Sequence, residues 1–475
     1  QVFLARTTMF SHLCHAVLEM RGQVSSPAAQ GTEQKRPRDE TPEPNDGRNV
    51  RSRTVQGSHV ANLSTTFELT TAGAAPAHIS SAVELATHFV EHRTHPEVDN
   101  VRIHEINALA PPYLVMEDNP ATPTCLEVVK RARHDAMACI AGKDDRLLVV
   151  TGPCSVHDPE GALDYARRLK GEIDRHGREL VLVMRTAITS NTPSGWKGLV
   201  HDPYLDGSCR VNEGLCMSRK LLRDINDLGV PCACELSDTV IPQFVSDLLS
   251  WAWIGPHAAE CQMTRDLVSG LSMPVGFKNS ASGSVVEAVD AVKRVSEEQC
   301  FYGISKHGTP AFLHSEGNRD AHVVLSGGDT FSNHDKGSVM KCLDQLHHLG
   351  LSQGVMVDCA QRCSKNHRQQ TQVASDVAQQ CRENLRICGV MLESNLFDGR
   401  QELPTGEALR AAGVVPAPAM DMITGKAVKS PVLESGMLRY GVSIASASVD
   451  WACASTVFET LATAVRERRK TLRKH

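Results

Sequence analysis

The sequence reads Leu147-Leu148-Val149-Val150-Thr151-Gly152-Pro153 at the point that decides its fold. Five apolar or β-branched residues are followed directly by Gly and Pro, the residues that most often end a regular element. A short apolar run with such an end predicts a strand that is buried on both faces. Strands of this kind are typical of parallel sheets, whose two faces are both covered.

Seven more runs of this kind follow along the chain, each with a plausible helix after it. The eight predicted strands are 147–151, 180–184, 231–235, 251–255, 274–278, 321–326, 354–358 and 387–392. The helix after the fifth strand and the last helix of the chain each carry apolar residues at helical spacing. Strands that alternate with amphipathic helices predict a parallel sheet, and eight repeats predict closure into a (β/α)8 TIM barrel.

Three segments lie outside the predicted barrel. Residues 21–59 are rich in Pro, Ser, Gly, Gln and charge, a composition that cannot bury enough surface to offset the entropy of ordering. We therefore predict a disordered or weakly ordered extension over 1–98 and a barrel domain over 99–475. An extra hairpin is predicted at 301–304 and 311–314, and the segment 402–440 is interpreted as an insertion, with a lid as the alternative.

Composition excludes several classes of function. The formal net charge is −5 and the basic residues are scattered, which argues against a nucleic-acid partner. No apolar run is long enough to span a bilayer. The 16 cysteines lie mostly in apolar stretches and lack the spacing of zinc ribbons, so reduced thiols in the cytoplasm fit best.

Chemistry in a barrel of this type lies at the carboxyl ends of the strands. Polar and charged residues occur at or just beyond every predicted strand end, so we expect them to converge on one cavity. These residues are Cys154, Arg185, Glu235, His257, Lys278, Ser326, Gln361 and Glu393.

Motifs around these strand ends carry a resemblance to a known family. They are Gly152-Pro153-Cys154-Ser155, Gly195-Trp196-Lys197-Gly198, Gly276-Phe277-Lys278-Asn279 and Leu392-Glu393-Ser394. In order and spacing the chain resembles, from about residue 100 to about residue 469, the type I 3-deoxy-D-arabino-heptulosonate 7-phosphate (DAHP) synthases of the phenylalanine- and tyrosine-sensitive class. The resemblance implies the condensation of phosphoenolpyruvate with erythrose 4-phosphate at a divalent metal, the first step of aromatic amino-acid biosynthesis.

The resemblance implies four metal ligands, and two of them match. Cys154 and Glu393 stand at the family's cysteine and glutamate, whereas Gln361 and Ser446 replace its histidine and aspartate. An amide and a hydroxyl are weak neutral ligands for a divalent ion. We therefore expect no tightly bound cofactor. A weak, different divalent site made by Cys154, Glu393 and His257 stays open as an alternative.

The cations that the resemblance implies for two phosphates are also replaced. His257 and Ser326 stand at two of the family's arginines, and 189–193 lacks the charged residues of the erythrose-phosphate loop. Charge-assisted hydrogen bonds contribute roughly 1.5–3 kcal/mol each. Even half of their sum predicts a rate at least about a hundredfold lower for the family's reaction.

Three hypotheses follow. In the first, the barrel is repurposed for a different carboxylate-bearing small molecule in secondary metabolism, with Arg185, Lys278, Lys306 and Glu235 binding it and with Arg185, Lys278, Lys306 and His257 in catalysis. In the second, the chain is a non-catalytic relative that pairs with an active paralogue. In the third, it is a slow but genuine DAHP synthase. A homodimer or higher oligomer is expected from the resemblance in each case.

Overall fold

The computed structural model describes residues 95, 97–190, 195–414 and 430–473, all within one compact unit that spans 75–475. The predicted disordered stretch 21–59 and nearly all of the predicted extension 1–98 lie outside the described residues. Within them, no helix is both long and apolar enough to cross a membrane.

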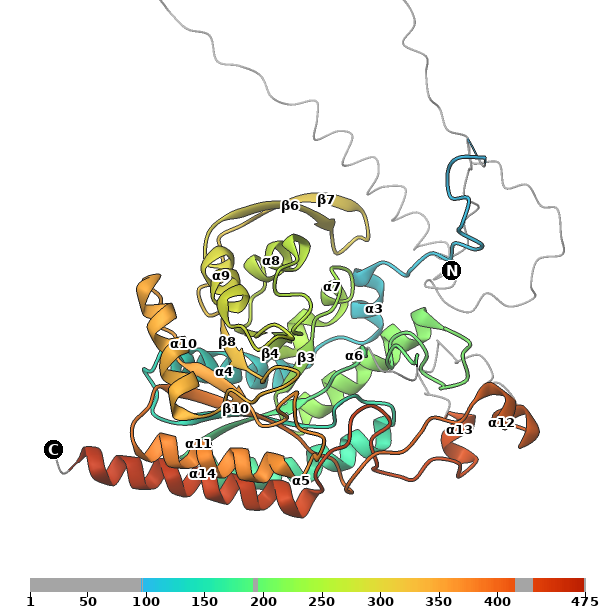
Figure 1. The fold of residues 1–475 in the computed structure, drawn as a ribbon. Helices are drawn as coiled ribbons and strands as arrows, with labels where there is room; N and C mark the ends of the chain where they lie inside the picture. The colour runs from blue at the N-terminus through green and yellow to red at the C-terminus, as the bar shows by residue number, and fades with distance from the viewer. Residues whose placement is uncertain (1–94, 96, 191–194, 415–429, 474–475) are drawn as a thin grey trace, which may run out of the picture. The chain divides into compact units, whose positions relative to one another are not determined.

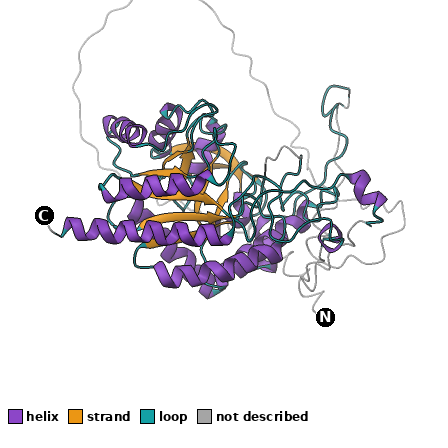
Figure 2. Ribbon diagram, turned by 60° about the horizontal axis from the view of Figure 1, so that its bottom comes forward, coloured by secondary structure: helices purple, strands orange, loops and turns teal. Residues whose placement is uncertain are grey.

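Eight parallel strands close into a barrel, as the sequence predicts (Figure 1). Each barrel strand pairs with its neighbours in chain order, and the first strand pairs with the last to complete the ring. Helices surround the strands in Figure 2. The barrel strands are β1 (Leu147–Gly152), β2 (Leu180–Arg185), β3 (Cys232–Glu235), β4 (Leu249–Ile254), β5 (Val275–Lys278), β8 (His322–Leu325), β9 (Val355–Asp358) and β10 (Ile387–Glu393).

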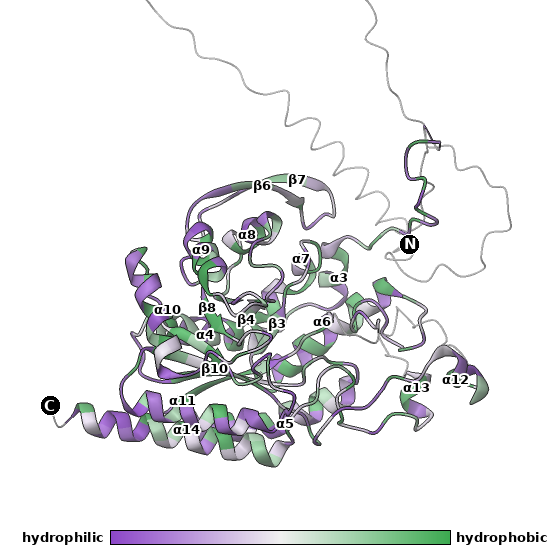
Figure 3. Cartoon of the chain, viewed as in Figure 1, coloured by the Kyte–Doolittle hydropathy of each residue, from purple (hydrophilic) through white to green (hydrophobic). Residues whose placement is uncertain are grey.

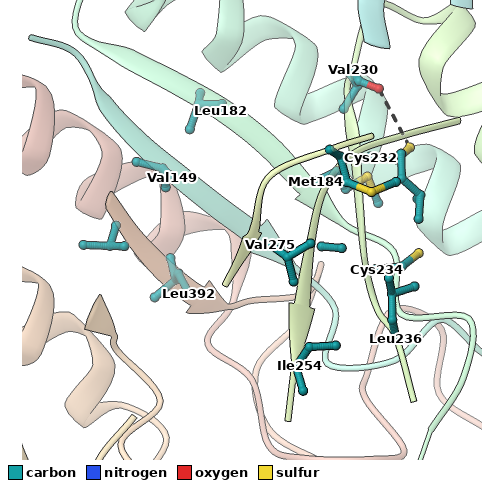
Figure 4. Close-up of a cluster of buried hydrophobic side chains, with 14 of the residues drawn as sticks. Val149, Leu182, Met184, Val230, Cys232, Cys234, Leu236, Ile254, Val275 and Leu392 are labelled. Carbon is teal, nitrogen blue, oxygen red and sulfur yellow. Dashed lines mark hydrogen bonds between the residues drawn. The ribbon is translucent and has the colours of Figure 1, made fainter. Parts of the chain in front are cut away.

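Alternate residues of each strand face either the barrel interior or the surrounding helices. The outward set packs against the helices in one large apolar cluster, part of which is drawn in Figure 4 with Val149, Leu182 and Val275. The inward set forms a second cluster that includes Leu148, Val183 and the stacked pair Trp251 and Trp253, whose ring centroids are 5.9 Å apart. Because both faces are buried, the strands are apolar almost throughout.

The helices cover the barrel with their apolar faces. Helices α11 (Gln369–Arg382) and α14 (Trp451–Leu472) lie side by side, and both alternate between hydrophobic and hydrophilic residues (Figure 3). The other helices are α3 (Pro112–Asp118), α4 (Pro123–Ile140), α5 (Pro159–His176), α6 (Val211–Asp227), α7 (Pro242–Val245), η1 (Ser246–Leu248), α8 (Gln262–Ser269), α9 (Val286–Val295), α10 (Lys336–His348), α12 (Gly406–Ala411) and α13 (Pro431–Glu434).

Helix α4 packs against the interior cluster through Ala136, Cys139 and Ile140. These residues lie at the helix end that immediately precedes β1, so they cover the amino-terminal end of the barrel. The opposite end carries the strand-to-helix loops. A site inside the barrel is therefore expected at the carboxyl ends of the strands.

The predicted hairpin is present as β6 (Gln299–Ile304) and β7 (Pro310–Ser315), an antiparallel pair outside the barrel. The described parts of 402–440 form a small apolar cluster with the loop after β2. Leu409, Val432 and Leu438 pack there with Trp196 and Leu205. The described parts of this segment thus pack on the loop after β2 through a small hydrophobic cluster that is separate from the barrel core.

Candidate functional site at the barrel mouth

The inward positions of the strands end in charged or polar side chains. Along β2, Val181 and Val183 are inward and Arg185 follows two residues later. The same two-residue spacing places Glu235 after Ala233, Asp358 after Met356, and Glu393 after Met391. Side chains on one strand face recur every second residue. The apolar interior therefore opens into a charged mouth, which contains Arg185, Glu235, Lys278, Asp358 and Glu393.

Arg185 is the most enclosed cation of the mouth. It is 2% exposed, its Nη2 donates to Oε1 of Glu393 at 3.1 Å, and its guanidinium lies 4.7 Å from the ring centre of Trp253. Burial lowers the pKa of Arg185, but Glu393 and the other acidic groups nearby outweigh it and raise the pKa. The buried Nε and Nη1 have no hydrogen-bond partner among the described residues. Two donor nitrogens of a permanent cation are thus available to a ligand.

Lys278 forms a second ion pair across the mouth. Its Nζ donates to Oδ2 of Asp358 at 2.6 Å, and Asp358 is fully buried. Burial lowers the pKa of Lys278, and the charge of Asp358 more than offsets that effect, so the pKa is raised. The ammonium therefore stays charged at neutral pH. Oδ1 of Asp358 accepts from the backbone N–H of Ala360 at 2.9 Å, which fixes the carboxylate in place.

Glu235 differs from the other two carboxylates because both nearby cations are already paired. Burial raises the pKa of its carboxyl, and the charges of Lys278 and Arg185 oppose that rise without cancelling it. Its Oε1 lies over Gly255, where an added Cβ would approach it to 2.6 Å, so a larger residue at that position would displace the carboxylate. A carboxyl with a raised pKa that forms no ion pair of its own with the described residues is suited to proton transfer.

Comparison with known proteins agrees with this architecture. Residues 124–420 match the model of the DAHP synthetase I family. The chain belongs to the DAHP synthetase I family. It is 39% identical over 375 residues to the phospho-2-dehydro-3-deoxyheptonate aldolase of Haemophilus influenzae, which covers 78% of this chain and 96% of the relative. Identity is also 39% to the Phe-sensitive aldolase of Escherichia coli strain K12, with 98% of that relative covered.

Among solved structures, the phospho-2-dehydro-3-deoxyheptonate aldolase of Francisella tularensis superimposes with a TM-score of 0.70 at 34% identity. The match covers 77% of this chain and 99% of that one. The resemblance and the TM-barrel expectation stated from the motifs are therefore confirmed. The barrel of this DAHP synthetase I family member is closed by all eight strands.

The two positions at which the resemblance implies a histidine and an aspartate ligand, Gln361 and Ser446, have other hydrogen-bond partners. Nε2 of Gln361 donates to the carbonyls of Asp358 and Leu325, and its Oε1 accepts from the N–H of Asn333. Ser446 hydrogen-bonds Cys154, and burial together with the charge of Glu393 raises the pKa of that thiol to about 12. No group of three or more His, Cys, Asp or Glu side chains in the described residues is arranged to hold a metal ion. This donor set does not fit the four-ligand site that the resemblance implies.

The remaining predicted site residues lie in three different places. Ser326 lies at the mouth, where its N–H and hydroxyl both donate to Oδ1 of the buried Asn279. His257 follows β4 and is exposed at the rim. Lys306 lies in the turn of the hairpin, where its Nζ donates to the carbonyl of Gln243 in α7, and burial lowers its pKa. The structure gives Lys306 no contact with Arg185 or Lys278.

Asp358 is the mouth residue that sequence reasoning missed. The signal for it was present, because an acidic residue directly follows the apolar run at 355–357, just as Arg185 follows the run of β2. What the sequence could not show is that Lys278 would select Asp358 and leave Glu235 without a close cationic partner.

Proposed function

We propose that this family member binds a small carboxylic acid at the barrel mouth and transforms it by proton transfer, in a lyase, aldol or cyclisation reaction. Arg185 and Lys278 bind the acid, and Glu235 gives or takes the proton. The observation that carries the proposal is the pair of buried, unpartnered donors of Arg185. Leaving such donors without an acceptor is unfavourable, and a ligand carboxylate supplies one.

The charges of the mouth favour a ligand with little negative charge. Two cations, Arg185 and Lys278, face three carboxyl groups, so the formal charge is −1 when all five are ionised. A phosphate dianion would be repelled by this arrangement, because both cations among these five groups are already paired with carboxylates. His257 and Ser326 stand where the resemblance expects guanidinium groups for phosphate. We therefore propose a carboxylate substrate without a phosphate group.

A thermal-shift and calorimetric screen of small carboxylic acids, with and without phosphate groups, tests this proposal. We expect unphosphorylated acids to raise the Tm and Arg185→Ala to abolish the effect. Lys306→Ala serves as the matched control, because its ammonium donates to the carbonyl of Gln243 in α7 and should not contribute. If no acid stabilises the protein, or if the Arg185 variant responds like the wild type, carboxylate binding at the mouth is refuted. The hypothesis of a non-catalytic relative would then be favoured.

Genuine DAHP synthesis is the second candidate, and the relatives favour it. Proteins named as phospho-2-dehydro-3-deoxyheptonate aldolases match over 96–98% of their length at 39% identity. Cys154, Arg185, Lys278 and Glu393 match the family's motifs. The assay is consumption of phosphoenolpyruvate with erythrose 4-phosphate across a series of divalent ions. Turnover with any ion would establish a genuine synthase and overturn the hypothesis of a different substrate. We expect no turnover.

The oligomer and the active paralogue remain predictions that rest on family membership. Light scattering of the purified chain tests the homodimer. Co-purification with an active synthase tests the predicted pairing with a paralogue. A monomeric chain that co-purifies with no synthase would count against that pairing.

A further inference from the structure

The hairpin β6–β7 carries a cysteine and a histidine side by side on its outer face. Cys300 and His314 are directly opposite in the register of the two strands, and Sγ of Cys300 lies 3.0 Å from Nδ1 of His314. Both residues are exposed. Directly opposite residues of an antiparallel pair project from the same face. A thiol and an imidazole are therefore within hydrogen-bond reach at the surface, away from the barrel mouth.

The other face of the hairpin holds this pair in position. Oγ of Ser315 lies 2.6 Å from Oγ of Ser269 in α8, and the ring of Phe301 packs beside Gly270. On the outer face, Phe312 meets the His314 ring edge to face, with ring centroids 5.1 Å apart. The imidazole is thus oriented by its neighbours, as a base that serves a nucleophile must be.

We propose that Cys300 is a nucleophilic thiol activated by His314 and that it reacts with small-molecule disulfides. This inference is independent of the function proposed for the barrel mouth. The thiol proton passes to Nδ1 of His314, and Sγ attacks one sulfur of the disulfide. A new sulfur–sulfur bond forms, the bond of the reagent breaks, and the departing thiolate takes the proton from the imidazolium. The products are a mixed disulfide on Cys300 and one free thiol.

The surroundings of the thiol indicate the kind of disulfide. Tyr302 is 86% exposed and Phe312 is 55% exposed, and their ring centroids lie 5.5 Å apart. Both rings project from the same strand face as Cys300 and His314, because the positions differ by two residues. Exposed aromatic rings beside a reactive group offer stacking surface to a flat apolar substituent. An aromatic disulfide is therefore the preferred reagent.

The chain contains its own control. Among the described cysteines, Cys209 and Cys300 are the two that are exposed. Cys209 lies in the loop before α6 with a φ of 52° and has no histidine bonded to its thiol in the described structure. Comparing the two thiols in one sample separates activation by His314 from simple accessibility.

The test treats the full chain with 4,4′-dithiodipyridine or oxidised glutathione and follows both cysteines by peptide mass spectrometry. We expect Cys300 to react at least about tenfold faster than Cys209, with the larger ratio for the aromatic reagent. His314→Gln should remove the advantage of Cys300 and leave the rate of Cys209 unchanged, and His314→Asn should do the same. In urea the two thiols should react alike.

Equal rates for Cys300 and Cys209 in the folded chain would overturn the proposal. So would a Cys300 rate that survives in both His314 variants, because accessibility alone would then explain it. The unchanged Cys209 rate and an unchanged circular dichroism spectrum show that the variants are folded, so a negative result cannot be attributed to unfolding.

Discussion

Both cations of the barrel mouth, Arg185 and Lys278, have a carboxylate of the protein as a partner. Arg185 pairs with Glu393, and Lys278 pairs with Asp358. Such pairs recover only part of the cost of removing charges from water, so their main effect is to make each partner depend on the other. Loss of one member leaves an uncompensated charge inside the barrel, which makes the pairs testable through stability.

Lys278→Met should lower the free energy of unfolding by about 3–5 kcal/mol, because Asp358 would remain buried without its cation. The double variant Lys278→Met with Asp358→Asn should recover part of that loss, since the amide oxygen can still accept from Ala360. Urea denaturation measures both values. Lys336→Met breaks an exposed pair with Glu383 and serves as the control, with no measurable change expected. A double variant less stable than the single one would contradict a buried ion pair.

Glu235 predicts a stability that depends on pH. Burial raises the pKa of its carboxyl above the unfolded value, so the folded state binds this proton more tightly than the unfolded state does. The stability it contributes is fully present in acid and is lost as the pH rises through the raised pKa. Glu235→Gln removes that loss. We expect the Tm of the variant to exceed that of the wild type at neutral pH and the difference to vanish in acid. A difference that is constant with pH would refute this assignment.

Individual side chains show where sequence reasoning stops. Arg185, Glu235, Lys278 and Glu393 were predicted to meet because strand ends converge in any barrel of this type, and they do meet. Lys306 was grouped with them by resemblance, but the turn of the hairpin directs its ammonium to the carbonyl of Gln243. Sequence spacing does not specify which way a hairpin turn outside the barrel points its side chains. Which carboxylate pairs with Arg185 or Lys278 likewise depends on distances between strand ends, and these are fixed only once the barrel is closed.

At the scale of elements, the sequence predicted which segments form strands, but it predicted less well where each strand begins and ends. Each run of apolar residues became a strand, because burial on both faces demands such runs. Strand β4 begins at Leu249 rather than at residue 251, since Ser250 interrupts the apolar pattern yet is fully buried. The segment 402–440 was interpreted as an insertion. Its apolar contacts with the loop after β2 could not be inferred, because they join positions about 200 residues apart in the chain.

The cluster between 402–440 and the loop after β2 should unfold separately from the barrel. Leu438→Ala truncates a side chain that is 7% exposed and packs in this small apolar cluster. We expect faster proteolytic cleavage between residues 402 and 440 and little change in global stability. Leu182→Ala is the matched control, since the same truncation in the barrel wall should cost about 2–5 kcal/mol. Equal global losses in the two variants would show that the segment is part of the main cooperative unit.

At the scale of the whole molecule, the barrel depends on the seam between its first and last strands. Strands β1 and β10 are about 240 residues apart in the chain, and their pairing from Leu148–Gly389 to Gly152–Glu393 closes the ring. Closure abolishes exposed sheet edges, so every strand gains from this one contact. It also brings Glu393 within reach of Arg185, which links the integrity of the seam to the geometry of the mouth.

Gly389 permits that closure, and a methyl group there should oppose it. A Cβ added at Gly389 would lie 2.4 Å from the carbonyl oxygen of Leu148 and 2.8 Å from Cε of Met356. Because the first of these is backbone, relief requires the strands to separate, and Gly389→Ala should cost about 3 kcal/mol or more. Gly171→Ala is the matched control in α5, where an added Cβ meets nothing within 4 Å and should stabilise by about 0.5–1 kcal/mol. Urea denaturation compares the stability of the two variants. Because Glu393 and Arg185 meet across the same seam, the Gly389 variant should also lose the rise in Tm with carboxylic acids. A Gly389 variant as stable as the wild type would mean that β1 and β10 are not held in this register.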